Sequence, residues 1–145
     1  MEFVPYQPWH YEYLTIPTLQ GQHMGKELVQ MYAAAYAIRG DSFTVKEKGQ
    51  IIGCGGVVSL WPGVGEAWTI LSDTIKTSPF FLHRKTFKVL LGLIRDRKYH
   101  RVQSIIWCCD SVAIRWIERL GFIWESDMKR YGHDGSDYAM YRWEG

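Results

Sequence analysis

The sequence predicts a mixed α+β fold, with a twisted central sheet of about six to seven strands flanked by helices. Three observations support this prediction. Helical and two-residue hydrophobic periods alternate along the chain, three predicted strands follow one another without an intervening helix, and the segment IIGCGGVVSL is too apolar to be buried on one side only. A sheet of this kind contains both parallel and antiparallel strand pairs.

Composition indicates a globular protein with one domain spanning residues 1–145. Of the 145 residues, 47% are hydrophobic and 22% are charged. The net charge of +2 is spread along the chain and does not by itself argue for nucleic acid, which we do not expect as a partner. No apolar run is long enough for a membrane span, and MEFVPYQPWH lacks the basic start of a signal peptide, so we expect no membrane partner and a cytoplasmic location. The three cysteines and the histidines have no spacing typical of zinc, so we expect no metal.

The first half of the chain predicts one helix and four strands. Prolines surround the strand that begins at Phe3, so it is not a central one. Helical spacing over Met24–Tyr36 is followed by strands at Ser42–Lys48, Ile51–Leu60 and Glu66–Leu71. Glycines in the second of these three strands indicate a bulge or a close backbone approach.

The second half begins with a helix that opens at Thr77-Ser78-Pro79. Its apolar face is predicted to contain Phe80, Phe87, Leu90, Leu91 and Ile94. A strand over Val102–Cys109 follows, in which the adjacent Cys108 and Cys109 are expected to be buried.

The segment DSVAIRWIERLGF predicts the last helix. Asp110 or Ser111 caps its start, Gly121 ends it, and Phe122 folds back on its last turn. A terminal hairpin is predicted from Met128–Tyr131, an Asp-Gly turn and Tyr138–Trp143.

An apolar strand, a short helix ending in Leu-Gly-Phe and a terminal strand pair resemble the final third of the GNAT superfamily of acyl-CoA-dependent N-acyltransferases. The strings LWPGVGEAW, RWIERLGF and YGHDGSDYAMY further resemble the small GNAT-like internal virion protein A of short-tailed phages, from Ile51 to the end. The resemblance implies that the strands at 66–71 and 102–109 splay apart around the pantetheine arm of CoA. It also implies acetyl-CoA as co-substrate and an amine acceptor, either a small molecule or a host protein.

The resemblance assigns roles to residues of the third meander strand. Glu66 stands where many relatives have the glutamate that deprotonates the amine, although a solvated residue at a strand start is an equally good interpretation. Cofactor contacts would come from Trp68, Thr69, Ile70 and Leu71, with the backbone N–H of Ile70 or Leu71 polarising the thioester carbonyl.

Two family features are changed in this sequence. The glycine-rich loop that holds the CoA pyrophosphate is replaced by SDTIKTSPFFLHRK, in which His83, Arg84 and Lys85 either compensate with side-chain charge or form a solvated basic face. In the last helix, Asp110, a candidate cofactor contact, takes the place of an asparagine, and Ile117 replaces the tyrosine that protonates the leaving thiolate.

The lost tyrosine leaves two interpretations open. If the protein is an enzyme, another acid is needed, and the candidates are Tyr131, Tyr138 and Tyr141, for which aromatic packing is the competing role. Alternatively, the protein is a catalytically degenerate phage protein that acts in virion assembly or host-protein interaction. Nucleic-acid binding through Phe80–Lys98 is the weakest hypothesis, since the basic residues do not form one stripe. Sequence leaves a homodimer or incorporation into a virion open.

Overall fold

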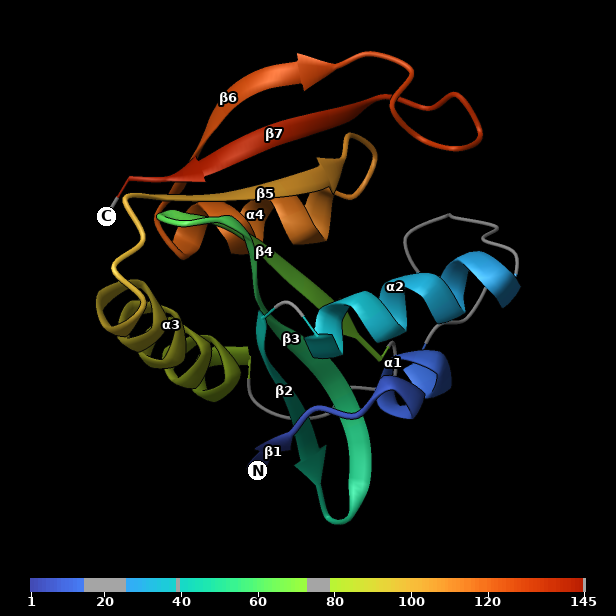
Figure 1. Ribbon diagram of the computed structural model, residues 1–145, viewed down its shortest axis with the longest axis vertical. Helices are drawn as coiled ribbons and strands as arrows, with labels where there is room; N and C mark the ends of the chain where they lie inside the picture. The colour runs from blue at the N-terminus through green and yellow to red at the C-terminus, as the bar shows by residue number, and fades with distance from the viewer. Residues whose placement is uncertain (15–25, 39, 73–78, 145) are drawn as a thin grey trace.

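A seven-stranded mixed sheet forms the centre of the protein in the computed structural model, which describes residues 1–14, 26–38, 40–72 and 79–144 (Figure 1). The strand order is β1-β2-β3-β4-β5-β7-β6, and the only parallel neighbours in this described sheet are β4 and β5. The elements are β1 (Glu2–Pro5), α1 (Pro8–Leu14), α2 (Lys26–Ile38), β2 (Gly40–Glu47), β3 (Gln50–Trp61), β4 (Val64–Leu71), α3 (Pro79–Asp96), β5 (Arg101–Trp107), α4 (Ser111–Arg119), β6 (Phe122–Met128) and β7 (Tyr138–Trp143). The predicted mixed α+β fold is therefore confirmed.

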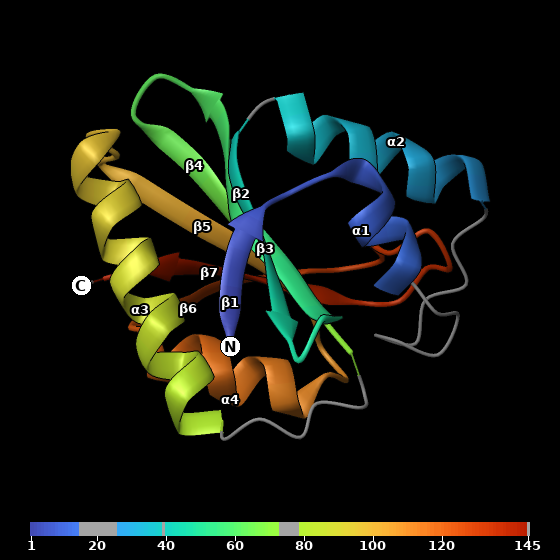
Figure 2. The ribbon, with the colours of Figure 1, turned by 90° about the horizontal axis from the view of Figure 1, so that it is seen from below.

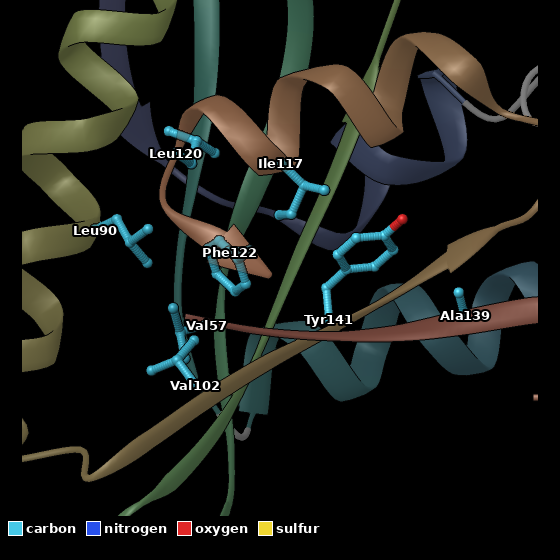
Figure 3. Packing of buried hydrophobic residues seen from close by; sticks show 8 residues of the cluster. All are labelled: Val57, Leu90, Val102, Ile117, Leu120, Phe122, Ala139 and Tyr141. Atoms are coloured by element: carbon cyan, nitrogen blue, oxygen red, sulfur yellow. The ribbon is translucent and has the colours of Figure 1, made fainter. Parts of the chain in front are cut away.

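The helices lie in two pairs on opposite faces of the sheet. Figure 2 shows α1 and α2 on one face and α3 and α4 on the other. A hydrocarbon core fills the space under α3 and α4, as Figure 3 shows. Its buried members are Val57, Leu90, Val102, Ile117, Leu120, Phe122, Ala139 and Tyr141. A second cluster, which includes Tyr6, Tyr11, Ala33, Cys54 and Ile70, packs α1 and α2 against the sheet.

The glycines of β3 allow close backbone approach, as predicted. A Cβ atom on Gly56 would lie 2.1 Å from the backbone oxygen of Asp41 on β2. Since backbone atoms cannot move aside cheaply, a side chain at this position would separate β2 from β3. The register of the β2–β3 ladder also shifts between Val45 and Lys46, which is the predicted bulge.

The predicted boundaries of the last helix agree with the structure. The side chain of Asp110 accepts a hydrogen bond from the Ala113 N–H, so Asp110 is the N-cap of α4. Gly121 has a φ of 101°, a conformation in which a side chain is strained, and it follows directly on the last turn. Phe122 then folds back into the core with Leu120.

Three details differ from the sequence predictions. Helix α1 was not predicted, because its buried residues, His10, Tyr11 and Leu14, include two polar side chains in a proline-rich segment. The first strand of the terminal hairpin is β6 (Phe122–Met128) and not Met128–Tyr131. Phe80 is 66% exposed and does not share the buried face of α3. The proposed cap at Thr77-Ser78 lies outside the described residues.

The two adjacent cysteines are also placed differently than predicted. β5 ends at Trp107, so Cys108 and Cys109 lie in the turn before α4, and both are exposed. The Cys108 N–H donates to the Asp137 carbonyl oxygen, which ties this turn to β7. The apolar run VQSIIWCC suggested a longer strand, but its last two residues are used to reverse the chain. Among the described residues, no helix has the length and hydropathy needed to cross a membrane.

Candidate active site

The predicted splay of β4 and β5 is present, and it begins directly after Glu66. The two strands are paired in register only over Val64–Glu66 and 101–103. At the point of divergence, the Ser104 hydroxyl donates a 3.0 Å hydrogen bond to the Ala67 carbonyl oxygen. Beyond this bond the strands separate, and in Figure 1 they diverge toward the side of the molecule on which α2 lies. The splay opens one edge of β4 over its last four residues.

Backbone groups on that edge are set by the alternation of the strand. The Ser72 N–H donates to the Ile52 carbonyl oxygen on β3, whereas the Ala67 carbonyl oxygen faces β5. Successive residues of a strand direct their backbone N–H and C=O groups to opposite edges. The backbone groups of Leu71 therefore face the opening, and those of Ile70 face β3. Of the two predicted donors to a thioester oxygen, only Leu71 has its N–H on the open edge. Its role in binding stays a prediction.

The Glu66 side chain is held by an amide on the neighbouring strand. Glu66 and Gln103 are register partners, and Gln103 Nε2 donates to Glu66 Oε1 at 3.2 Å. Gln103 Oε1 in turn accepts from Arg101 Nε at 2.9 Å. This second bond fixes the amide orientation, because a cation is a donor only and requires the amide oxygen to face it. One carboxylate oxygen of Glu66 is thus oriented by Gln103.

The positive charge of Arg101 is directed away from Glu66. Its guanidinium forms two hydrogen bonds with the Glu125 carboxylate, at 2.9 and 2.6 Å. These bonds raise the pKa of Arg101 and lower the pKa of Glu125. Arg142 also contacts Glu125, at 3.2 Å. The Glu125 carboxylate therefore neutralises the charge of Arg101. Gln103, which is uncharged, orients the Glu66 carboxylate without placing a positive charge beside it.

Two tryptophan side chains flank the splay with unused donors. The indole N–H groups of Trp68 on β4 and Trp107 on β5 are buried and have no hydrogen-bond partner among the described residues. Trp68 follows Glu66 by two residues and Trp107 follows Gln103 by four, so all four side chains project to one face of the sheet. Buried donors without acceptors are costly in a protein interior. The amide and thioester carbonyl oxygens of acetyl-CoA are acceptors of the kind that these donors fit.

The basic residues predicted to hold the CoA pyrophosphate lie on α3 and are not gathered at the splay. Arg84 is exposed, and the Lys85 ammonium lies 5.5 Å from the centre of the Phe3 ring on the edge strand β1. The His83 ring stacks on Phe87, and its buried Nδ1 has no partner among the described residues. Residues 73–78, part of the segment SDTIKTSPFFLHRK, lie outside the described residues. The cofactor role of these residues stays a prediction.

At the position where the resemblance implies a tyrosine, the chain has aliphatic packing. Ile117 is buried in the core under α4, and Figure 3 shows the Tyr141 ring beside it. Tyr141 is the register partner of Ser104, whose hydroxyl marks the start of the splay. Burial raises the pKa of Tyr141, so its phenol stays protonated at neutral pH. The other two candidates, Tyr131 and Tyr138, are on the α2 side of the sheet.

Of the residues that the structure brings together at the candidate site, Glu66 and Trp68 were predicted from sequence, whereas Gln103 and Tyr36 were not. Tyr36 on α2 stacks in parallel on Trp68, with ring centroids 4.0 Å apart and an interplanar angle of 9°. Gln103 had a readable signal, because it is a polar residue inside the apolar run that forms β5. Tyr36 had none, since neighbouring aromatic residues on a helix usually belong to the core.

The fold of this chain is that of the GNAT acetyltransferases. It superposes on an IAA acetyltransferase from Bacillus cereus with a TM-score of 0.75, at 10% identity over 98% of this chain and 97% of the other. A GNAT family acetyltransferase from Elizabethkingia anophelis with acetyl-CoA bound gives 0.71, at 14% identity over 99% and 97%. The ribosomal-protein-S18-alanine N-acetyltransferase from Escherichia coli gives 0.70, at 15% identity over 98% and 92%. No family model and no curated protein matches the sequence.

Proposed function

We propose that the protein is an N-acetyltransferase that transfers an acetyl group from acetyl-CoA to an amine. The observation that carries this proposal is the position of Glu66, a carboxylate at the last register pair before β4 and β5 diverge. A base at this position is next to the strand edge on which an acyl thioester would lie. The acceptor amine is a small molecule or a side chain or terminus of a host protein.

In this proposal, acetyl-CoA supplies an activated thioester, and residues of the chain perform the proton transfers. Glu66 removes a proton from the acceptor ammonium, either directly or through one water molecule. Gln103 holds one oxygen of Glu66, so the other oxygen is left to accept the proton. The Leu71 N–H donates to the thioester oxygen.

The leaving thiolate needs a proton, and we assign this role to Tyr141. Tyr141 lies beside Ile117, and its phenol is protonated at neutral pH, so it has a proton to donate. The indole N–H groups of Trp68 and Trp107 bind amide oxygens of the pantetheine arm. Asp110 is engaged as the cap of α4, so its contribution to cofactor binding is indirect.

The first test measures acetyl-CoA binding and acetyl transfer separately. A ligand at about a hundred times its dissociation constant adds about 2.7 kcal/mol to native-state stability, so acetyl-CoA should raise the melting temperature by several degrees. Transfer is followed by release of free CoA thiol in the presence of a panel of amines. Glu66→Gln should lower the rate by about a hundredfold or more, because general base catalysis contributes at least that factor.

The matched control is Glu2→Gln, which makes the same change on an exposed residue of β1 and should leave the rate unchanged. If Glu66→Gln transfers acetyl groups as fast as the parent protein, Glu66 is not the base. If acetyl-CoA binds but no amine in the panel is acetylated, the acceptor panel is extended to host-protein N-termini.

A second function is favoured by Ile117, which is buried where active relatives have an acid. The alternative is a GNAT-fold phage protein that has lost catalysis and acts in virion assembly or host-protein interaction. This alternative predicts no thermal shift at millimolar acetyl-CoA and no release of CoA thiol. It also predicts that the chain is found in purified particles, which mass spectrometry of virions tests directly.

A further inference from the structure

Aromatic side chains form a continuous stack from the sheet to the surface of α2. Trp68 on β4 stacks on Tyr36, and Tyr36 stacks on Tyr32 with ring centroids 6.1 Å apart and an interplanar angle of 26°. Tyr32 is 42% exposed, so the outer end of the stack reaches solvent. Glu66 is two residues before Trp68 in the same strand and projects to the same face. The stack therefore begins beside the candidate base.

A second aromatic pair comes from the terminal hairpin. Tyr131 and Tyr138 contact edge to face, with ring centroids 5.4 Å apart. Tyr138 is the register partner of Trp107 on β5, so it lies on the same face of the sheet as Gln103 and Glu66. Figure 1 shows that the connection between β6 and β7 and helix α2 lie on the same side of the molecule. The open strand ends of the splay thus have aromatic residues from two distant parts of the chain.

The Glu66 carboxylate interacts electrostatically with both sets of rings. Burial and then the charges of Tyr11 and Glu66 raise the pKa of Tyr36, while burial followed by Glu66 raises the pKa of Tyr131. Every group that perturbs these two phenols is acidic or another tyrosine. The nearby Lys129 is paired with the Asp137 carboxylate at 3.3 Å. The phenols of Tyr36 and Tyr131 are therefore uncharged at neutral pH, and both lie within electrostatic range of the Glu66 carboxylate.

We propose that the stack of Tyr32, Tyr36 and Trp68, together with the Tyr131–Tyr138 pair, binds the acceptor as an organic cation. The ammonium group faces Glu66, and the carbon atoms next to it pack on the rings. Aromatic faces attract cations through the ring quadrupole, and a carboxylate adds a direct charge interaction. This inference rests on the proposed acetyl transfer and names its acceptor class: an alkylammonium without an acidic group beside the nitrogen, since a second carboxylate would be repelled by Glu66.

Binding of cations that cannot be acetylated tests the inference without requiring catalysis. Three probes of similar shape are titrated by calorimetry: choline, its uncharged carbon isostere dimethylbutanol, and betaine, which adds a carboxylate. Choline should bind about tenfold more tightly than dimethylbutanol, in line with cation–π and charge contributions, and betaine should bind more weakly than choline. Equal affinity for choline and dimethylbutanol would overturn the inference.

Variants of the exposed rings locate the site. Tyr32→Leu and Tyr131→Leu should each weaken choline binding several-fold, whereas Tyr32→Phe retains the aromatic face and most of the affinity. Both positions are partly exposed, at 42% and 54%, so leucine is tolerated by the fold. Tyr13→Leu is the matched control, because Tyr13 is an exposed tyrosine with no ring contact to the stack among those described. Unchanged choline affinity in both leucine variants also overturns the inference.

The inference and the proposed function fail in distinguishable ways. If choline binds as expected but acetyl-CoA neither binds nor is consumed, the cation site stands and acetyl transfer is rejected. If an amine is acetylated and choline does not compete with it, acetyl transfer stands and the cation site is rejected. Competition by choline, together with its loss in Tyr32→Leu, supports both.

Discussion

On the face of the sheet under α3 and α4, the buried cluster is built almost entirely from hydrocarbon, with Phe122 and Val57 among its least exposed side chains. The face under α1 and α2 buries the polar pair His10 and Thr44 and also contains Trp68, whose N–H has no partner among the described residues. Hydrocarbon burial contributes stability in proportion to area, whereas buried polar groups are costly unless bonded. The first face therefore contributes most of the apolar burial, and the second carries Glu66 and the aromatic stack that we propose for binding; Tyr141, the proposed acid, belongs to the first face.

The largest effect that tests this division is expected from Phe122→Ala. Phe122 is 2% exposed and contacts side chains of both α3 and α4 (Figure 3). Removing a buried phenylalanine ring costs about 3–5 kcal/mol, as transfer free energy and cavity formation add. The free energy of unfolding is measured by urea titration. Phe81→Ala is the control, because Phe81 is 62% exposed and its loss should change stability by no more than about 0.5 kcal/mol. Equal losses of unfolding free energy in Phe122→Ala and Phe81→Ala would contradict the division between the two faces.

On the other face, Gln103→Met is expected to affect activity and not stability. Methionine retains the length of the side chain but cannot donate to Glu66 or accept from Arg101. We expect the kcat for acetyl transfer to fall about tenfold, while the KM for acetyl-CoA is unchanged, because the loss of one oriented hydrogen bond is worth about 1.4 kcal/mol. Steady-state kinetics and a urea titration separate activity from stability. Gln50→Met, on the exposed end of β3, is the control. A rise in KM with unchanged kcat would show that Gln103 binds cofactor instead.

A smaller effect on stability is expected at the start of α4. Asp110→Ala removes the oxygen that accepts from the Ala113 N–H, and loss of an N-cap typically costs about 1 kcal/mol. Asp110→Asn retains an accepting oxygen and should be close to the parent protein in its melting temperature. If Asp110→Ala leaves stability unchanged but weakens acetyl-CoA binding, Asp110 contacts the cofactor directly and is more than a cap.

Local signals account for the parts of the fold that could be predicted. Helix α4 was predicted to within a residue because its cap, its apolar period and Gly121 all lie in one short segment. Strand β6 was misplaced because Ile123–Asp127 are exposed along an edge of the sheet and show no buried alternation. Helix α1 was missed because its contacts with Thr44 and Tyr36 are made by residues far away in the chain.

The same limit applies to the candidate site. Glu66 and Trp68 were assigned from strings that resemble the family, since a short segment contains both. The partner of Glu66 could not be assigned, because Gln103 reaches it only after 37 residues and through a parallel strand pair. The stack of Tyr36 on Trp68 likewise depends on how α2 crosses the sheet, which no local spacing determines.

The smallest of these effects is a dependence of stability on pH that arises from His10, under α1. Its Nδ1 accepts from the Gln7 N–H at 3.0 Å and lies 2.6 Å from the Thr44 hydroxyl, which also bonds to Cys54. Burial and then the Lys46 charge lower the pKa of His10 below the ordinary histidine value of 6.5. Protonation of Nδ1 would remove the acceptor that Gln7 requires.

The sign of the pH effect follows from this lowered pKa. The unfolded chain binds a proton at His10 more readily than the folded chain, so stability is full above about pH 6.5 and decreases as the pH falls below that value toward the folded pKa. Melting temperatures between about pH 7.5 and pH 5 measure the slope. His10→Gln has a carboxamide oxygen that still accepts from Gln7 and should reduce the slope, whereas His100→Gln changes an exposed histidine and should retain it. If the melting temperature of His10→Gln depends on pH as strongly as that of the parent protein, the buried polar network under α1 is not the source of the pH dependence.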